Sequence, residues 1–259
     1  MTILDKIIID KQIEVANRKN MLSIDDLRFA PLYDRACISL KNSLLNSSTG
    51  IIAEFKRKSP SKGWIKENAE VLSIASGYNQ AGASGISILT DTKYFGGVSE
   101  DLSTARPHIQ VPILRKDFMI DTYQLHESKA MGADVVLLIA AALTIKETKE
   151  LAKTAKQIGL EVLLEIHHRD ELHHINEYID IVGVNNRNLK TFEVDVDTSV
   201  ALAELIPSEF LKISESGISS PHTIKELRAV GFQGFLMGEN FMKEENPAQA
   251  LQDFITQLL

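Results

Sequence analysis

The sequence is poor in several features, and each shortage excludes a class of protein. Cys37 is the only cysteine in 259 residues, so no disulfide can form within the chain, which fits a reducing compartment. Basic residues are outnumbered by acidic ones, 28 to 35, which gives a net charge of −7. An acidic surface disfavours nucleic acid as a partner, because phosphate backbones bind basic surfaces. A small anionic ligand remains possible, since a single pocket can be basic on an acidic protein.

Long hydrophobic runs are also missing. The longest covers residues 135–143, which is about half of the length that crosses a membrane. Asp5 and Lys6 interrupt the start of the chain, and no apolar core of signal-peptide length follows them. We therefore expect no signal peptide, no membrane association and a cytoplasmic location.

Common cofactor, metal and nucleophile motifs are missing too. No G-x-G-x-x-G follows the first predicted strand, and no G-x-S-x-G is present. His167 with His168, and His173 with His174, resemble a metal cluster at first sight. Adjacent histidines point to opposite faces of a strand, however, and no carboxylate completes an open metal site by spacing. We interpret all four as surface histidines and expect neither a metal nor an organic cofactor.

The composition that remains is that of an ordinary soluble protein, 44% hydrophobic and 24% charged. A chain of this length can bury a large core without disulfides or a structural metal. No low-complexity tract or Pro/Gly-rich hinge divides it, so we expect one domain over residues 1–259.

The first 45 residues are predicted to be helical. Leu4, Ile7, Ile8 and Val15 recur at helical spacing with charges between them. Ser23, with an acid three residues later, has the form of a capping box that begins a second helix. We assign residues 1–48 to an N-terminal helical extension and residues 49–259 to the domain that follows.

A repeated unit occupies this second part. In four places a glycine ends a helical pattern and an apolar strand follows at once: Gly82, Gly132, Gly159 and Gly231. Glycine tolerates the left-handed conformation that ends many helices, so each segment is read as a helix followed by a strand. Together with apolar runs at 51–55, 112–115, 179–184 and 211–214, the count is eight strands, starting near residues 51, 86, 112, 134, 161, 180, 211 and 234.

Eight βα units in about 210 residues predict a closed (β/α)8 TIM barrel of the α/β class. Several strands are apolar on both faces, as in residues 135–139, which favours a parallel sheet covered by helices. A doubly wound open sheet is the alternative, and the missing dinucleotide fingerprint weakens it.

Polar residues follow the strands at the end where barrels carry their active sites. Each alone is ordinary, since a charged residue that ends a strand is usually solvated. Together they converge on one mouth, at residues 54, 56, 116, 165, 185–187, 215–217 and 238–240. A ring of ion pairs that closes the barrel end is the competing explanation for the charges, and Lys116 paired with Glu54 is its specific form. That ring would not explain the glycines beside them.

Gly217 and Gly238 follow the last two strands, where barrels often bind phosphate through backbone N–H groups. Ser59 lies in a Ser-Pro-Ser sequence after the first strand and adds a hydroxyl donor. Phosphate binding and ordinary turn chemistry are equally open on position alone.

Six ordered segments resemble the indole-3-glycerol-phosphate synthase family, a family of (β/α)8 barrels in tryptophan synthesis. They are 52–63 (IAEFKRKSPSKG), 89–97 (LTDTKYFGG), 112–118 (PILRKDF), 164–167 (LEIH), 184–192 (VNNRNLKTF) and 215–218 (ESGI). The resemblance implies conversion of 1-(2-carboxyphenylamino)-1-deoxyribulose 5-phosphate into indole-3-glycerol phosphate, carbon dioxide and water, with no cofactor. It also implies a small phosphorylated substrate, and we expect a monomer or a weak homo-oligomer. The segment 30–42 matches the family loosely.

The resemblance also implies roles for individual residues. Lys116 matches a general acid and Glu165 a base or proton donor. Lys56 matches the lysine that meets the substrate carboxylate and is also a candidate for a second acid, so the division of the acid role between Lys56 and Lys116 stays open. Glu54 matches a carboxylate that orients the sugar hydroxyls and the lysines. The remaining matches fall into three groups: Asn185 and Ser216 at the reacting centre; Arg187, Phe95, Phe118, Leu137 and Leu189 around the aromatic ring; and Ser59, Gly217, Gly238 and Glu239 around the phosphate. Two other functions stay open, a sugar-phosphate isomerase on the same barrel, such as phosphoribosylanthranilate isomerase, and a non-catalytic ligand-binding barrel.

Overall fold

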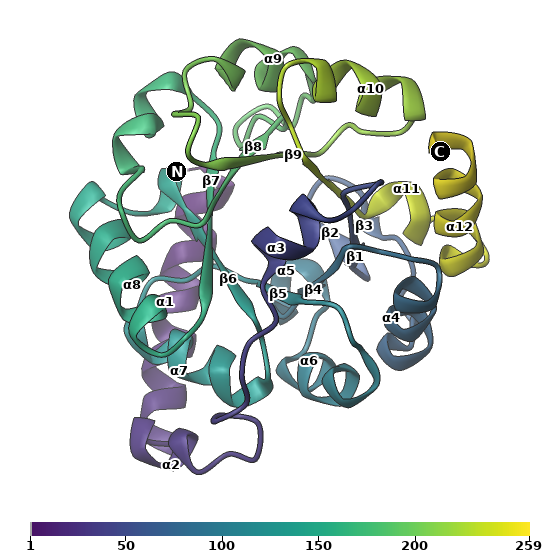
Figure 1. The fold of residues 1–259 in the computed structure, drawn as a ribbon. Coiled ribbons are helices and arrows are strands. Elements are labelled where there is room, and N and C mark those ends of the chain that lie inside the picture. The colour runs from purple at the N-terminus through teal and green to yellow at the C-terminus, as the bar shows by residue number, and fades with distance from the viewer. Residues whose placement is uncertain (1) are drawn as a thin grey trace.

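Eight parallel strands close into a barrel at the centre of the computed structural model, which describes residues 2–259 (Figure 1). Strand β1 pairs with β4 on one side and with β10 on the other, which confirms the closed barrel and excludes the open sheet. The eight strands lie where the sequence predicts them: β1 Ile51–Phe55, β4 Gly85–Leu89, β5 Ile113–Lys116, β6 Val135–Ile139, β7 Glu161–Ile166, β8 Ile181–Asn185, β9 Leu211–Glu215 and β10 Gly234–Met237.

Helices surround the barrel; most of them connect successive strands, and α11 and α12 follow the last strand. They are α4 Val71–Gln80, α5 Thr92–Phe95, α6 Ser99–Ala105, α7 Thr122–Met131, α8 Ile145–Gln157, α9 Asp197–Ala203, α10 Pro221–Ala229, α11 Glu239–Met242 and α12 Pro247–Leu258, with 3-10 turns η1 Arg106–His108, η2 Ala140–Ala142 and η3 Arg169–His174. The four glycines of the sequence repeat all have positive φ angles, between +80° and +93°. This confirms that each one turns the chain out of a helix toward the next strand.

The strands are buried on both faces, because alternate side chains point into the barrel and out toward the helices. The inward-pointing side chains form a separate apolar cluster that includes Ile52, Leu114, Leu163 and Ile213. In each of these strands the next inward position toward the mouth, two residues on, is charged: Glu54, Lys116, Glu165 and Glu215. Apolar side chains therefore fill the interior of the barrel, and charged side chains line its carboxyl-terminal end.

The N-terminal part contains three helices, α1 Ile3–Met21, α2 Ile24–Arg28 and α3 Leu40–Leu45. The capping box at Ser23 is confirmed, since its hydroxyl accepts a hydrogen bond from the backbone of Asp26. The prediction of helix throughout the first 45 residues is wrong for 29–39. Asp134 of the barrel accepts hydrogen bonds from the backbone N–H of Ile38 and from the Arg35 side chain there, and these tertiary contacts replace helical ones.

This N-terminal part touches both ends of the barrel. In Figure 1, α3 crosses the opening nearest the viewer, and its Leu40 and Leu44 belong to the inner apolar cluster. At the opposite end, Ile3, Leu4 and Ile7 of α1 reach the mouth. The extension therefore closes the floor of the barrel with one helix and flanks the mouth with another.

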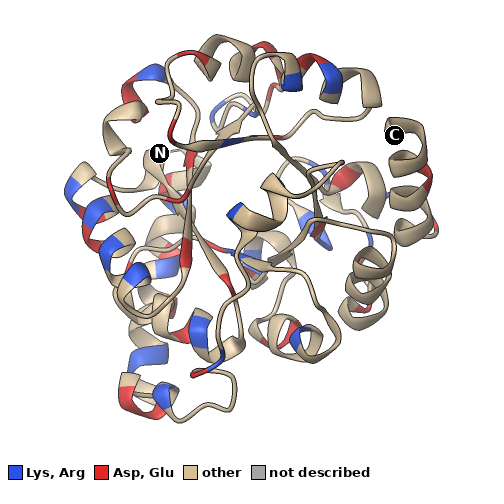
Figure 2. Ribbon diagram, in the orientation of Figure 1, with Lys and Arg blue, Asp and Glu red and all other residues tan. Residues whose placement is uncertain are grey.

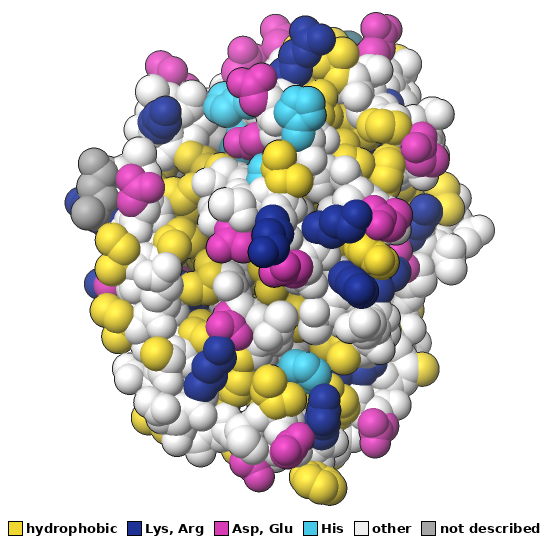
Figure 3. Space-filling view, turned by 90° about the vertical axis from the view of Figure 1, so that its left-hand side faces the viewer, with side chains coloured by type: hydrophobic (Ala, Val, Ile, Leu, Met, Phe, Trp, Pro, Cys, Tyr) yellow, Lys and Arg dark blue, Asp and Glu magenta, His cyan; other side chains and the backbone are white. Residues whose placement is uncertain are grey.

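Charged residues of both signs are spread over the outer helices (Figure 2). The face that carries α1, α7 and α8 shows lysines, arginines and acids interspersed among apolar side chains (Figure 3). Within residues 2–259, the helices fall short of the combination of length and hydropathy that crossing a membrane requires.

Candidate active site

A cavity of about 690 Å³ opens at the carboxyl-terminal end of the barrel. The structure brings together at this cavity every site residue that the sequence singled out: Glu54, Lys56, Ser59, Phe95, Lys116, Phe118, Leu137, Glu165, Asn185, Arg187, Leu189, Ser216, Gly217, Gly238 and Glu239. They come from the carboxyl-terminal parts of seven strands (β1, β5, β6, β7, β8, β9 and β10), from the segments that follow these strands and, for Phe95, from α5 after β4. Barrel closure is what makes these distant positions neighbours.

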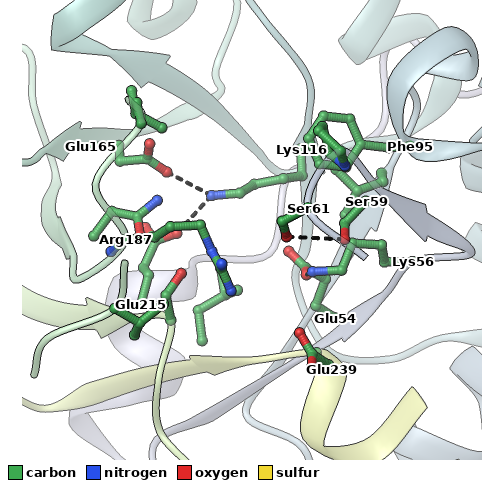
Figure 4. A pocket seen from close by; sticks show the side chains of 18 of the residues that line it. Glu54, Lys56, Ser59, Ser61, Phe95, Lys116, Glu165, Arg187, Glu215 and Glu239 are labelled. Atoms are coloured by element: carbon green, nitrogen blue, oxygen red, sulfur yellow. Dashed lines mark hydrogen bonds and ion pairs between the residues drawn. The ribbon is translucent and has the colours of Figure 1, made fainter. Parts of the chain in front are cut away.

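Lys116 lies at the centre of the site, between two carboxylates (Figure 4). Its Nζ is 2.8 Å from Oε2 of Glu165 and 2.6 Å from Oε2 of Glu215, and both acids are buried. Burial alone would lower the pKa of Lys116, but the charges of Glu165 and Glu215 outweigh it and raise that pKa. The lysine is therefore held in its protonated form when the pocket is empty of substrate.

The two acids differ in their own titration. Burial, reinforced by the charge of Glu165, raises the pKa of Glu215 although Lys116 opposes it. For Glu165 the effect of burial is outweighed by Lys116 and then by His167, and the pKa is lowered. Lys116 thus pairs with one carboxylate that stays ionised, Glu165, and with one that readily takes up a proton, Glu215.

Lys56 and Glu54 form a second pair on the other side of the mouth, with the Lys56 Nζ donating to Oε1 of Glu54 at 2.6 Å. Both side chains extend from the end of β1 toward the cavity, as the alternation along that strand predicts. The alternative in which Lys116 pairs with Glu54 is wrong, because Glu165 and Glu215 are the partners of Lys116.

A short hairpin follows this pair and borders the cavity. Strands β2 Lys58–Ser59 and β3 Gly63–Trp64 form it, and the sequence did not predict them. The Ser59 hydroxyl accepts a hydrogen bond from the backbone N–H of Lys62 and lies 3.5 Å from the Ser61 hydroxyl. The hairpin holds these hydroxyl groups at the rim, next to the turns after β9 and β10.

The turn after β9 has an unusual backbone. Ser216 and Gly217 both have left-handed φ angles, +68° and +77°, and for Ser216 this conformation is strained. The side chain of Asn186 supports the turn by donating to the Ser216 carbonyl at 2.9 Å. A Cβ atom at Gly217 would lie 2.5 Å from a methyl group of Val194, so a side chain there would force the turn to move.

Apolar side chains form the remaining wall. The rings of Phe95 and Phe118 lie with their centroids 6.0 Å apart, and Leu137 and Leu189 add to the surface. Arg187 also lines the cavity, and its guanidinium donates to the carbonyl of Phe192 at 3.2 Å. An aromatic ring with an attached carboxylate would find apolar contacts and nearby cations here.

Sequence reasoning counted Glu215 among the polar residues at the mouth (215–217) but gave it no role in the candidate site. The signal was present, because Leu211, Ile213 and Glu215 alternate along β9 as Ile52 and Glu54 do along β1. Applying that alternation to every strand would have singled out Glu215 as an inward-pointing side chain.

Contacts from α1 were also missed. Lys11 is 1% exposed and forms ion pairs with Asp91 at 2.9 Å, Asp117 at 2.9 Å and Glu14 at 2.8 Å. Asp117 is the residue after Lys116 and also pairs with the buried Arg115 at 3.0 Å. These cations outweigh the effect of burial and hold the pKa of Asp117 below its usual range. No local pattern on a helix marks a lysine for burial, so this cluster could not be read from the sequence.

The interpretation of four surface histidines is half correct. His168 and His173 are exposed, whereas His167 and His174 are buried. The turn η3 covers the end of β7, so that His167 lies beside Glu165 and Glu171, and His174 bonds Thr148. Within the described part of the chain, no group of three or more His, Cys, Asp or Glu side chains is arranged to hold a metal ion.

The fold and the cavity define a (β/α)8 barrel with paired lysines and carboxylates at its carboxyl-terminal mouth. A model of the family described as indole-3-glycerol phosphate synthase matches residues 4–254. The chain belongs to this family.

Individual relatives agree with this assignment. Indole-3-glycerol phosphate synthase of Bacteroides thetaiotaomicron is 53% identical over 98% of this chain and 97% of its own length. The enzyme of the same name from Salinibacter ruber is 42% identical over 97% and 94%. A solved structure of 3-hexulose-6-phosphate synthase from Salmonella typhimurium covers 81% of this chain and 100% of its own, with a TM-score of 0.61 and 12% identity. That likeness shows the shared fold alone.

Proposed function

We propose that this protein closes the indole ring of indole-3-glycerol phosphate, using 1-(2-carboxyphenylamino)-1-deoxyribulose 5-phosphate as its substrate. In this reaction a ring carbon of the anthranilate attacks the C2′ carbonyl of the sugar. Loss of the carboxylate restores the aromatic ring, and loss of a hydroxyl group completes the indole. The reaction needs a cation for the carboxylate, an acid for the carbonyl and the departing hydroxyl, and a base for the protons released.

The observation that carries this proposal is the shared ammonium group of Lys116. Two buried carboxylates keep it protonated, at 2.8 and 2.6 Å, so it enters the reaction as an acid. Its proton goes to the carbonyl oxygen as the ring carbon attacks. Glu165 remains ionised beside it and accepts a proton in the dehydration or returns one to the departing hydroxyl.

The rest of the substrate is oriented by the two ends of the cavity. Lys56 and Arg187 face the anthranilate carboxylate, and Glu54 holds Lys56 in place at 2.6 Å. The ring lies against Phe95 and Phe118, with Leu137 and Leu189 completing the wall. Asn185 and Ser216 contact the reacting part of the sugar.

The phosphate is proposed to bind where the turns after β9 and β10 meet the hairpin after β1. Gly217 and Gly238 allow the anion to approach the backbone, and the N–H groups at the start of α11, including that of Glu239, have no carbonyl in a preceding turn to bond. Ser59 adds its hydroxyl. This arrangement also explains how a protein with a net charge of −7 would recognise an anion.

The same proposal covers the setting of the reaction. We propose a small phosphorylated molecule as the ligand, no nucleic-acid or membrane partner, no metal or organic cofactor, a monomer or weak homo-oligomer, and a cytoplasmic location. A phosphoribosylanthranilate isomerase would share the phosphate site but would not call for two lysines and three carboxylates at one mouth. A binding barrel without catalysis would not need a lysine poised between two acids.

The test is direct. The protein is incubated with the substrate in buffer without added metal, and the rise of indole fluorescence is followed. We expect turnover by the parent, turnover lower by about 10²–10⁴-fold for Lys116→Met, and parental turnover by Lys146→Met, whose lysine is exposed on α8. The isomerase reading is supported instead if phosphoribosylanthranilate is consumed and no indole forms from the later substrate.

A further inference from the structure

Glu165 and Glu215 are nearly equivalent with respect to Lys116. Each offers one carboxylate oxygen to the same ammonium group, at 2.8 and 2.6 Å, and each is buried. When Lys116 gives its proton to the substrate, its charge disappears and the two acids are left without it. One of them must then stay ionised for the later proton transfers, and Lys116 itself does not decide which.

The surroundings of the two acids break this equivalence. His167, the residue directly after β7, places Nε2 3.3 Å from Oε1 of Glu165, the oxygen that Lys116 leaves free. The other ring nitrogen lies 3.5 Å from Oε2 of Glu171, which also accepts the backbone N–H of His167 at 2.6 Å. The imidazole is thus enclosed between two carboxylates and is only 4% exposed.

Glu215 has no such neighbour. Its second oxygen, Oε1, is buried and has no hydrogen-bond partner among the residues that the structure describes. Across from it lies Gly183 of β8, where a Cβ atom would come within 2.5 Å of that oxygen. Glu215 therefore faces a small, uncharged surface on the side away from Lys116.

We propose that His167 is a positioning residue that acts as a second cation behind Glu165 and thereby makes Glu165, rather than Glu215, the carboxylate that stays ionised through the reaction. The inference rests on the proposed function, since it assigns the base of that reaction. His167 does not line the cavity, so it acts on the substrate only through Glu165.

The charges around His167 favour its protonated form. Burial disfavours the imidazolium, but Glu171, Glu165 and, at longer range, Glu215 outweigh it, and the pKa of His167 is raised. Its sequence neighbour His168 stands with its ring 6.4 Å away and is exposed. Lys116 is a further positive charge near Glu165, which it contacts through the carboxylate oxygen that His167 does not face.

The test compares His167→Gln with the parent from pH 4 to pH 9. Glutamine keeps an amide donor near Glu165 but carries no charge. An opposite charge at this distance lowers a carboxyl pKa by about 1–3 units. Removing it should therefore raise the pKa of Glu165 from about 2 to about 3–5, so that kcat of the variant falls behind the parent only at the acid end, by up to about twofold at pH 5 and about tenfold at pH 4, and matches it at pH 9. KM should stay close to the parental value.

Two comparison variants make the result decisive. His174→Gln removes another buried histidine, from η3, and should leave the pH profile unchanged, so it measures the cost of losing any buried imidazole there. Glu171→Gln should move the profile in the same direction as His167→Gln, but less. The proposal is overturned if the defect of His167→Gln is the same at all pH values or if it lies in KM. It is also overturned if His167→Gln has the same pH profile of kcat as the parent.

A measurement without substrate separates this idea from the proposed function. A carboxyl whose pKa is lowered by folding adds stability above its unfolded pKa, and this stability is lost as the pH falls through the folded pKa. As the pH is lowered, the melting temperature of His167→Gln should consequently begin to fall at a higher pH than that of the parent or of His174→Gln. If the parent formed no indole but this difference were found, the reaction would be wrong and the role of His167 would stand. Identical unfolding profiles would overturn the role of His167.

Discussion

Replacing Lys116 with methionine tests the centre of the site, because the variant keeps the apolar stem and removes the ammonium group that Glu165 and Glu215 share. A positioned general acid contributes about 10²–10⁴-fold in rate, which corresponds to about 3–5 kcal/mol of barrier. We expect kcat of Lys116→Met to fall by that factor. KM should change little, since Lys56 and Arg187 still face the carboxylate and the turns still face the phosphate.

The same variant has a calculable effect on stability. Leaving two buried carboxylates without their cation costs about 3–5 kcal/mol if both stay ionised. Glu215 can avoid this cost by taking up a proton, because its pKa is already raised to about 7 in the presence of Lys116 and rises further without it. At neutral pH the variant can thus hold a proton on Glu215 and avoid most of the repulsion.

The sign of the pH dependence follows from that proton. A carboxyl with a raised folded pKa binds a proton in the folded state that the unfolded chain has released, so stability falls as the pH rises between the two pKa values. Above pH 7 the stability of Lys116→Met should drop away from that of the parent by about 1.4 kcal/mol per pH unit. Chemical denaturation at pH 6, 7, 8 and 9 measures this difference.

The double variant Lys116→Met with Glu215→Gln separates catalysis from structure. It should regain stability and lose the added pH dependence, because the second buried charge is gone, but it should remain as slow as the single variant. If the double variant regained turnover together with stability, Lys116 would have only a structural role. The acid would then have to be Lys56, and Lys56→Met would carry the large loss in kcat.

Three further outcomes are expected. Lys11→Met should lower the free energy of unfolding by about 3–5 kcal/mol, because Asp91 and Asp117 lose a buried cation. Lys19→Met, at an exposed pair, should lower it by no more than about 1 kcal/mol in the same denaturation assay. Equal losses in the two variants would contradict the importance of burial. Gly217→Ala, at a φ of +77° and with its Cβ 2.5 Å from a neighbouring methyl group, should raise KM and the inhibition constant of inorganic phosphate together; a loss confined to kcat would place the phosphate elsewhere. Saturating EDTA should leave activity unchanged, and a loss that zinc or magnesium restored would show a metal requirement.

The sequence by itself determined the barrel. The strands could be placed because hydrophobic period and chain length per unit are local properties, and the helix ends because Gly82, Gly132, Gly159 and Gly231 supply a left-handed conformation. Alternation along β1 placed Glu54 and Lys56 on the inner face before any contact was known. The resemblance to the family then supplied the candidate residues, all of which line one cavity.

Only the tertiary structure decided which charges meet. Lys116 on β5 pairs with Glu215 on β9, and three strands separate these two around the barrel. Such a contact depends on closure across the mouth, which no local pattern encodes. The burial of His167 and Lys11 and the non-helical path of residues 29–39 have the same origin, because each depends on partners that the fold brings from far along the chain. Local sequence sets the direction in which a side chain points, and closure of the barrel determines which groups lie next to that side chain.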